Sequence, residues 1–397
     1  MNLLKKFLKH IVVIVILGYP AYQLLHHFHS LTPLMREVAD FKFTDIYFGH
    51  FQKRILDDNI YFVDVGVKDK NTTRLEIAEF INNVNKNYKP KVIAIDVDFK
   101  IDTAVSDTVN EKLISSLNND NIILSYDLKN IKGQWIEDKS ELPINYNIVK
   151  DGFTNNLIAN SGVEFGVERF FQPSILQNND TLKHFSVVTS KKSGVNIDKS
   201  LLKDNNKVMI NFKYKYHDAI SIGDTNNYFK LKDKIVIVGL FSKNKKGNPL
   251  YNEDLHYTAS NKFYLGKSPP NMYGGEVLAT IISNINKNSF ITYFKGLSFW
   301  INLILSLVVY LCLIHFLGKS HNVFTATIIF TQFGLVTFFV FCSIFIVHRF
   351  NIYLDLTVLG IITFFSVEFI GAIDHLIHLV ESKFIPAVKN KFNKKKL

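Results

Sequence analysis

Carboxylates stand where apolar, strand-like stretches end in the first half of the chain. Asp64 follows the run IYFV, while Asp96 and Asp98 follow VIAI. Ligands of parallel sheets bind beyond the carboxyl ends of the strands. Carboxylates that converge there could hold a cation through oxygen ligands or contact another polar ligand. The alternative is that these side chains cap helices and fix loops.

Three further polar residues are candidates for ligand binding, of which Asp254 and His256 could face the same cleft. Arg169 lies in the run GVERFF and could hold an anionic ligand or a backbone carbonyl; Asp254 and His256 lie in EDLHYTA. The sequence shows no Gly-rich phosphate loop and no Ser/His/Asp or Cys/His constellation. We therefore predict ligand-binding roles for these residues and the strand-end carboxylates, and we assign no catalytic residue, metal or cofactor.

Alternating elements would position these residues. Residues 59–66, 91–99 and 121–126 are apolar and strand-like, and the intervening 73–87 and 107–118 carry helical apolar stripes, the second with Asp107 as its N-cap. This rhythm predicts a mostly parallel sheet with flanking helices.

Later strands are predicted at 184–189, 207–212 and 234–240, and a closing helix at 273–288. Residues 127–183 are polar and irregular and receive no assignment.

Four apolar spans predict an α-helical membrane region. Residues 7–25 follow a basic leader, and we interpret them as an uncleaved anchor, with a cleaved signal peptide as the alternative. The other spans, 298–317, 323–347 and 352–373, are each long enough to cross a bilayer. The predicted domains are an anchor (1–29), an extracytoplasmic α/β domain (30–290), a three-helix membrane region (291–378) and a basic cytoplasmic tail (379–397).

Charge distribution predicts the topology. The formal net charge is +11, and the excess lies at the two ends of the chain. Basic ends suit contact with anionic membrane lipids, whereas nucleic-acid binding would need a basic face on the folded domain. The Lys/Arg bias places both termini in the cytoplasm and the large domain outside. We expect a multi-pass protein of a bacterial plasma (inner) membrane.

One acid lies well inside the fourth span. Glu368 is costly there and should face other helices or be neutral. A signalling role, packing against Asn302 or Gln332, and a simple protonated acid all stay open. Asp374 and His378 are four residues apart, which predicts a local pair.

Several motifs together resemble a known family. They are IYFVDVG (60–66), PKVIAIDVDF (90–99), GVERFFQP (166–173), LKDKIVIVGLFS (231–242) and MYGGEVLATIISNI (272–285). The chain resembles the CHASE2 family of extracytoplasmic sensory domains, over about residues 30–290 and in the layout of its apolar spans. In the last motif Gly275, Glu276, Val277 and Ala279 fit the family pattern. Leu278 stands where His is usual, so a role of that His does not carry over.

The resemblance implies sensing without naming a stimulus. Such proteins usually continue into an output enzyme, but here about 24 residues follow the fourth span, too few to fold as one. The chain resembles a stand-alone membrane form.

We therefore predict a non-enzymatic membrane sensor or receptor subunit. Its expected partners are an extracytoplasmic ligand and a separate membrane or cytoplasmic signalling protein, with a homo-oligomer left open. The residues expected to transmit the signal are Gly275, Glu276, Ala279 and Glu368. One alternative is a structural or assembly protein of the cell envelope that docks a partner constitutively. Another is an enzyme using Asp64, Asp96 and Asp98.

Overall fold

The computed structural model divides the chain into two compact units. The first comprises Met1–Tyr47, Leu265–Lys267 and Tyr293–Leu397, and the second comprises Phe48–Tyr264 and Ser268–Thr292. The structure describes residues 7–10, 42–132, 134–154, 167–177, 180–203, 206–241, 254–262, 270–294, 296–317, 324–354, 356–384 and 386.

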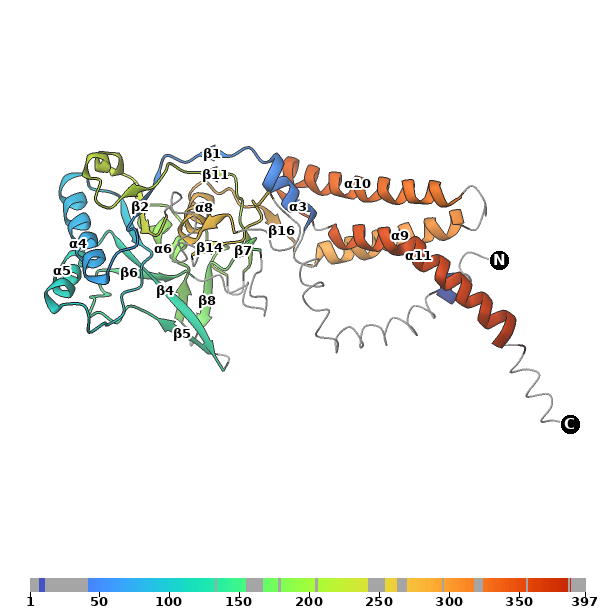
Figure 1. The fold of residues 1–397 in the computed structure, drawn as a ribbon, viewed down its shortest axis with the longest axis horizontal. Helices are drawn as coiled ribbons and strands as arrows, with labels where there is room; N and C mark the ends of the chain where they lie inside the picture. The colour runs from blue at the N-terminus through green and yellow to red at the C-terminus, as the bar shows by residue number, and fades with distance from the viewer. Residues whose placement is uncertain are drawn as a thin grey trace. The chain divides into compact units, whose positions relative to one another are not determined.

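A seven-stranded sheet forms the centre of the second unit (Figure 1). The strand order is β12-β2-β13-β3-β4-β5, and β6 also pairs with β4. The strands are β2 (Ile60–Asp64), β3 (Val92–Ile95), β4 (Ile122–Ile131), β5 (Gln134–Asp138), β6 (Lys150–Phe153), β12 (Ile220–Ser221) and β13 (Ile235–Gly239). All pairs are parallel except β4 with β5. The predicted mostly parallel sheet is confirmed.

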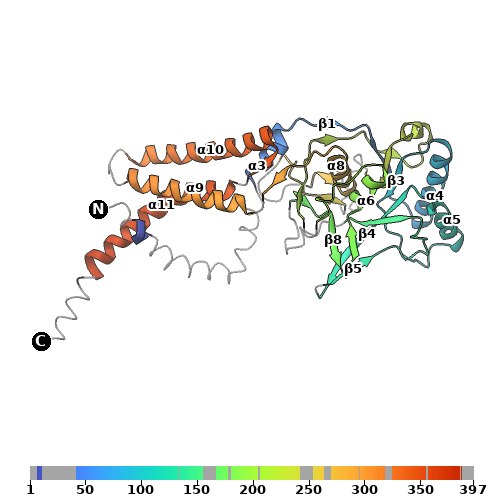
Figure 2. The same ribbon diagram turned by 180° about the vertical axis from the view of Figure 1, so that it is seen from behind.

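Helices cover both faces of this sheet. On one face α4 (Lys70–Asn87), α5 (Asp107–Leu117) and the 3-10 helix η3 (Thr225–Leu231) share an apolar core with the strands, and α4 and α5 lie side by side (Figure 2). On the other face α6 (Phe185–Lys192) and α8 (Gly274–Asn286) do the same. Successive strand residues alternate between the two cores, which is why the strands are apolar throughout rather than at every second position.

Two local predictions are wrong. The N-cap of α5 is Ser106, whose side chain accepts from the Val109 amide, and not Asp107. Residues 184–189, predicted as a strand, form most of α6. His184 caps this helix by accepting from the Ser186 amide, and burial lowers the pKa of His184 to about 3, so the ring is a neutral acceptor.

Short strands complete the second unit. They pair as β1 (Ile55–Leu56) with β11 (Tyr214–Lys215), β7 (Phe170–Phe171) with β10 (Val208–Met209), β8 (Ser174–Gln177) with β9 (Asp180–Lys183), and β14 (Leu255–His256) with β15 (Met272–Tyr273). Of the predicted strand 207–212, only Val208–Met209 is a strand, and it lies outside the main sheet.

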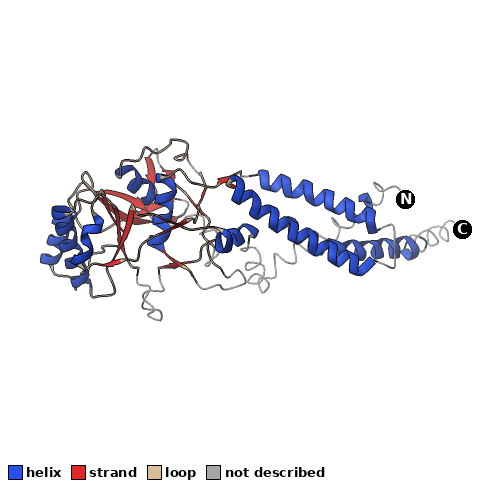
Figure 3. Cartoon of the chain, turned by 90° about the horizontal axis from the view of Figure 1, so that it is seen from above, coloured by secondary structure: helices blue, strands red, loops and turns tan. Residues whose placement is uncertain are grey.

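The first unit is helical (Figure 3). Its elements are α3 (Phe43–Ile46), the start of the π-helix η2 (Tyr47–Phe51), α9 (Leu297–Leu317), α10 (Phe324–Phe350), β17 (Ile352–Tyr353), α11 (Thr357–Leu379) and the π-helix η4 (Val380–Phe384), while β16 (Thr292–Tyr293) joins the two units along the chain. The predicted spans 298–317 and 323–347 correspond closely to α9 and α10, whereas the span 352–373 begins with β17 and overlaps α11, which continues to Leu379. By length and composition, one helix in the described part of the chain, Gln332–Phe350, is able to cross a membrane; Phe299–Ile314 is apolar but shorter.

Polar contacts tie residues 7–10 to the helices of this unit. The buried His10 bonds to the Tyr310 hydroxyl through Nδ1 (2.8 Å) and to Asp374 through Nε2 (2.9 Å), and Lys9 pairs with Glu381. Asp374 therefore pairs with His10 and not, as predicted, with His378. The remainder of the span 7–25 and most of the basic tail lie outside the described residues.

Candidate functional site

Asp64 fixes the loops at the carboxyl end of β2. Its Oδ1 accepts from the amides of Gly66 and Phe241, both at 3.1 Å. Phe241 follows β13, the neighbouring strand, so this carboxylate joins the ends of two strands. The structural reading of Asp64 fits these contacts.

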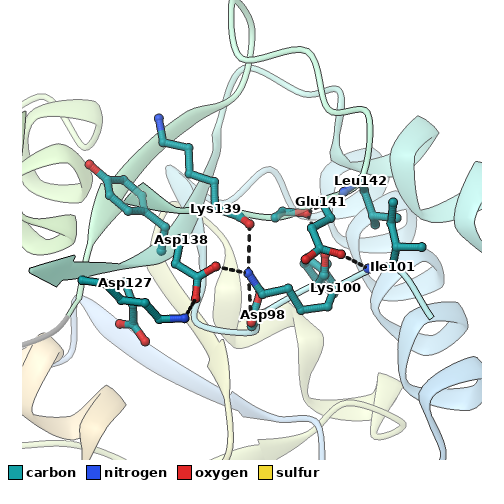
Figure 4. A network of polar contacts seen from close by, with 12 residues as sticks. Asp98, Lys100, Ile101, Asp127, Asp138, Lys139, Glu141 and Leu142 are labelled. Atoms are coloured by element: carbon teal, nitrogen blue, oxygen red, sulfur yellow. Dashed lines mark hydrogen bonds and ion pairs between the residues drawn. The ribbon is translucent and has the colours of Figure 1, made fainter. Parts of the chain in front are cut away.

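Asp98 belongs to a network of ion pairs that joins the segment after β3 to β4 and β5 (Figure 4). Its side chain is 59% exposed and lies 3.7 Å from Lys100 Nζ, which also pairs with Asp138. Lys129 closes the network with a 2.6 Å contact to Asp138. Burial still raises the pKa of Asp98, against the effect of Lys100.

Asp96, just beyond β3, has a very different environment. The residue is half-buried, and its amide donates to the Val238 carbonyl on β13 (2.8 Å). Burial, and then the negative charges of Asp254 and Asp127, raise the pKa of Asp96 to about 7, whereas a hydrogen bond from Ser125 and the charge of His256 oppose the rise. Asp96 is therefore able to gain or lose a proton near neutral pH.

His256 on β14 lies between two carboxylates. Its Nδ1 contacts Glu168 Oε1 at 2.7 Å, and its Nε2 lies 3.6 Å from Asp254 Oδ1. Burial alone would lower the pKa of His256, but hydrogen bonds and charge interactions with Asp254 and Glu168 raise it to about 10. The imidazole is consequently a cation at neutral pH. Asp96, Glu168, Asp254 and His256 are called the acid–histidine cluster below.

The N-terminus of α8 packs directly against this cluster. A Cβ on Gly274 would lie 2.6 Å from Asp254 Oδ1 and 3.1 Å from His256 Nε2. A Cβ on Gly275 would lie 2.5 Å from the ring of Phe241, which stacks on Phe62 with centroids 4.5 Å apart. Only glycine permits both approaches, and the positive end of the helix dipole favours the nearby acids.

Two other predicted residues of α8 have structural contacts. Glu276 Oε2 accepts from the Tyr273 amide at 3.0 Å, which closes a capping box at the start of the helix. Ala279 is fully buried in the core between α8 and the sheet, next to Leu278. Glu368 lies in α11, and its side chain is outside what the structure describes.

Arg169 is buried and directly follows Glu168 of the cluster in the sequence. Its Nη1 lies 3.5 Å from the Val167 carbonyl, and its own carbonyl accepts from the Ile210 amide (2.8 Å). The adjacent Glu168 is the cluster residue that sequence reasoning missed. An acid next to Arg169 in a motif already singled out was the available signal.

Asp254 and His256 lie beside one another, and the charges of both act on the pKa of Asp96, whereas Asp98 pairs with Lys100. Among the described residues, no group of three or more His, Cys, Asp or Glu side chains has an arrangement that could hold a metal ion. The cluster combines one carboxyl group that titrates near neutrality with an imidazolium clamped by two acids. The acid–histidine cluster is therefore able to exchange a proton, or to bind a polar ligand next to the N-terminus of α8.

The model of the CHASE2 domain family matches residues 13–316. The chain belongs to the CHASE2 family of extracellular sensory domains. No curated protein and no solved structure matches the chain significantly.

Proposed function

We propose that this chain is a non-enzymatic membrane sensor or receptor subunit. The observation that carries the proposal is the acid–histidine cluster packed on the first turn of α8, inside a domain of a sensory family. The outer domain binds a ligand or partner, and the membrane helices transmit the event to a separate protein. Asp64 accepts from backbone amides and Asp98 is largely exposed, which supports a binding domain over an enzyme built on these acids.

The proposed membrane arrangement has four crossing helices, formed by residues 7–25, α9, α10 and α11. Its support comes from the apolar composition of these segments and from the contacts that His10 makes with Tyr310 of α9 and Asp374 of α11. The Lys/Arg bias orients the bundle with both termini in the cytoplasm and the large domain outside. The basic ends contact anionic lipids.

The proposed signal passes along α8. A ligand shifts an equilibrium only through different affinities for its two states. The acid–histidine cluster can provide this difference, because a change of charge there acts on Gly274 and Gly275 at the start of α8. Along the chain, α8 leads within about ten residues to α9. Glu276 and Ala279 hold the helix, and Glu368 is the proposed acid of the membrane response.

Cysteine accessibility tests the proposal. Single cysteines at Asn286, the last residue of α8, and at Lys319, between α9 and α10, are introduced after Cys312 and Cys342 are replaced by Ala. Each labelling rate is divided by the rate of an exposed Lys232→Cys reference at the same pH, which cancels the ionisation of the thiol itself, and the ratios are compared at pH 5.5 and 8.5, on either side of the Asp96 titration. We expect the ratios for the Asn286 and Lys319 sites to change by about threefold or more between the two pH values, and the change to vanish in Asp96→Asn.

The opposite outcome identifies the alternative. If both labelling ratios, taken relative to the Lys232→Cys reference, stay constant with pH while the domain retains a stable partner in pull-down, constitutive docking in the envelope replaces sensing. A pH response that persists in Asp96→Asn would show that another group triggers it.

A further inference from the structure

A polar cavity of about 540 Å³ opens in the second unit. The segment from Phe48 to Arg54 lines one side, and residues 260–262 with Asn271 line the other. None of these residues belongs to the acid–histidine cluster. Both walls are continuous in sequence with the first unit, since Tyr47 precedes Phe48 and Leu265 follows shortly after Lys262.

The charged side chains of the cavity are basic. Arg54, Lys262 and the imidazole of His50 line it, and no carboxylate does so within the described part of the chain. Arg54 Nη2 donates to the Ser260 carbonyl at 3.4 Å, and His50 Nε2 lies 3.2 Å from the Lys262 carbonyl. The described residues provide no ion-pair partner for Arg54 or Lys262. A guanidinium retains further donors in a fork that matches a carboxylate or a phosphate.

The opposite wall is held in place by hydrogen bonds. Asn271 Oδ1 accepts from the Thr258 amide (3.0 Å), and Asn271 Nδ2 donates to Ser260 Oγ (3.0 Å). Ser260 Oγ in turn contacts Thr258 Oγ1 at 2.8 Å. The polar surface is thereby preformed rather than assembled on binding, which lowers the entropic cost of binding.

Gln52 presents an acceptor whose orientation the neighbouring bonds determine. Asn211 Nδ2 donates to the Ser289 carbonyl (2.9 Å), so Asn211 Oδ1 is the acceptor that faces Gln52. Gln52 must then donate through Nε2 (2.6 Å). Its Oε1 is buried in the cavity wall and has no hydrogen-bond partner among the described residues. A small rotation of this side chain would offer Oε1 to a ligand hydroxyl or N–H group.

Asn211, the hydrogen-bond partner of Gln52, is in turn bonded to α8. The Asn211 amide donates to Asn284 Oδ1 (2.8 Å), and Asn284 Nδ2 donates to the Asn211 carbonyl (3.0 Å). Asn284 is a fully buried residue of α8. Movement of Gln52 on binding would therefore act on Asn211, whose backbone is held by α8.

We propose that this cavity binds a small organic anion that also carries a hydroxyl group, such as a hydroxycarboxylate or a phosphate ester of a polyol. Arg54 and Lys262 hold the anionic groups, and Gln52 Oε1 accepts from the hydroxyl. The volume exceeds the needs of a simple inorganic anion. The site deepens the proposed function by giving the ligand class of the sensor, and in that respect it rests on that function. The same chemistry could come from a soluble molecule or from a lipid headgroup, and the test separates these sources.

Calorimetric titration of the full chain in detergent tests the site. The probes are malate, succinate, glycerol 3-phosphate and inorganic phosphate. We expect malate or glycerol 3-phosphate to bind with a Kd of about 1 mM or tighter, and Arg54→Gln/Lys262→Gln to weaken that binding at least about tenfold. The matched control Lys53→Gln/Lys232→Gln removes two exposed cations that do not line the cavity and should change the Kd by less than about twofold.

Gln52 gives a second readout. Gln52→Leu should remove any preference for malate over succinate while leaving succinate binding within about twofold, because only the hydroxyl contact is lost. Failure of both malate and glycerol 3-phosphate to bind, or equal binding by the Arg54/Lys262 variant, overturns the site. Binding restricted to phosphatidylglycerol vesicles and dependent on Arg54 and Lys262 assigns the anion to lipid and overturns a soluble ligand.

The outcomes distinguish this site from the proposed function. Anion binding without any change in labelling at Asn286 and Lys319 supports the site and contradicts transmission. A pH-dependent change at those positions without anion binding supports transmission from the acid–histidine cluster and overturns the cavity as its ligand site.

Discussion

Asp96 and His256 have pKa values shifted in the same direction by different causes. The pKa of Asp96 is raised to about 7, mainly by burial. The pKa of His256 is raised to about 10 by its two carboxylate neighbours, against the effect of burial. Both folded-state pKa values lie above the values of the unfolded chain. Both groups therefore lower stability as pH rises, but in different pH windows.

Asp96→Asn should remove the loss of stability that accompanies rising pH between about 4 and 7. The unfolded chain releases the Asp96 proton near pH 4 and the folded protein near pH 7, so the wild-type protein loses stability between these values and the variant does not. At pH 8 the variant should be more stable by about 1–3 kcal/mol. Thermal unfolding in detergent, followed by Trp135 fluorescence after Trp300→Phe, measures the second unit.

A surface acid provides the control for that measurement. Asp120→Asn removes a carboxylate whose side chain is 86% exposed and should leave the slope unchanged. Equal slopes in wild-type and Asp96→Asn proteins would show that Asp96 does not keep its proton in the folded state.

His256→Gln should change the pH dependence of stability between about pH 6.5 and 10. The imidazolium contribution is fully present below about pH 6.5 and is lost as pH rises towards 10. Because the side chain is 38% exposed, solvent screening reduces the effect to about 1–2 kcal/mol. The same fluorescence measurement should show a destabilisation at pH 6 that shrinks by pH 9.5. A loss independent of pH would indicate that His256 acts through packing alone.

Sequence could place the acids but not their partners. Strand-end position identified Asp64 and Asp96 equally, yet Asp64 accepts from two amides while Asp96 is partly buried beside other charges. That difference depends on which loop meets each carboxylate. Glu168 reaches His256 from 88 residues away, and no local pattern encodes such a contact.

At the scale of the element, the first turn of α8 packs closely against its neighbours because Gly274 and Gly275 have no side chains. Gly275→Ala would place a Cβ 2.5 Å from the Phe241 ring, which is buried and stacked on Phe62. The ring cannot move away cheaply, so we expect a destabilisation of about 1–3 kcal/mol. Gly223→Ala, where nothing lies within 4 Å, should change stability by less than about 0.5 kcal/mol.

Restoring space tests the cause of this effect. Phe241→Leu should cost stability by itself, but should reduce the additional cost of Gly275→Ala, and a double-mutant cycle measures the coupling. Additive effects of the two substitutions would contradict a steric origin.

The central elements were predictable because their patterns are strong. The runs around β2, β3 and β4 are apolar on both faces, and α4 carries an uninterrupted helical stripe. The segment HFSVVTS misled because its β-branched residues suggest a strand, whereas a buried His184 caps it as α6. Within 127–183, β5, β8 and β9 gain their order from hairpin pairing, and β6 and β7 from pairing with β4 and β10, which composition does not reveal.

At the scale of the whole molecule, covalent connection alone shows how the two units could communicate. The chain passes from the first unit to the second after Tyr47, returns briefly at Leu265–Lys267, and returns again after Thr292. The cavity wall begins at the first of these connections, and α8 ends shortly before the last. A ligand that altered either element would act on segments that lead directly into the helical unit.

The proposed topology makes a last prediction. With Cys312 and Cys342 replaced by Ala, a cysteine at Lys232 lies in the large domain, and one at Lys396 lies in the basic tail. A membrane-impermeant maleimide should label Lys232→Cys once the outer envelope is opened, and Lys396→Cys only after the plasma membrane is permeabilised, because the Lys/Arg-rich ends stay on the cytoplasmic side. Asp233→Cys, also exposed, serves as a second external position and controls for local reactivity. Labelling of Lys396→Cys in sealed spheroplasts at the rate of Lys232→Cys would mean that the chain crosses the membrane an even number of times between the two positions instead of the three proposed, and the four-helix arrangement would have to be abandoned.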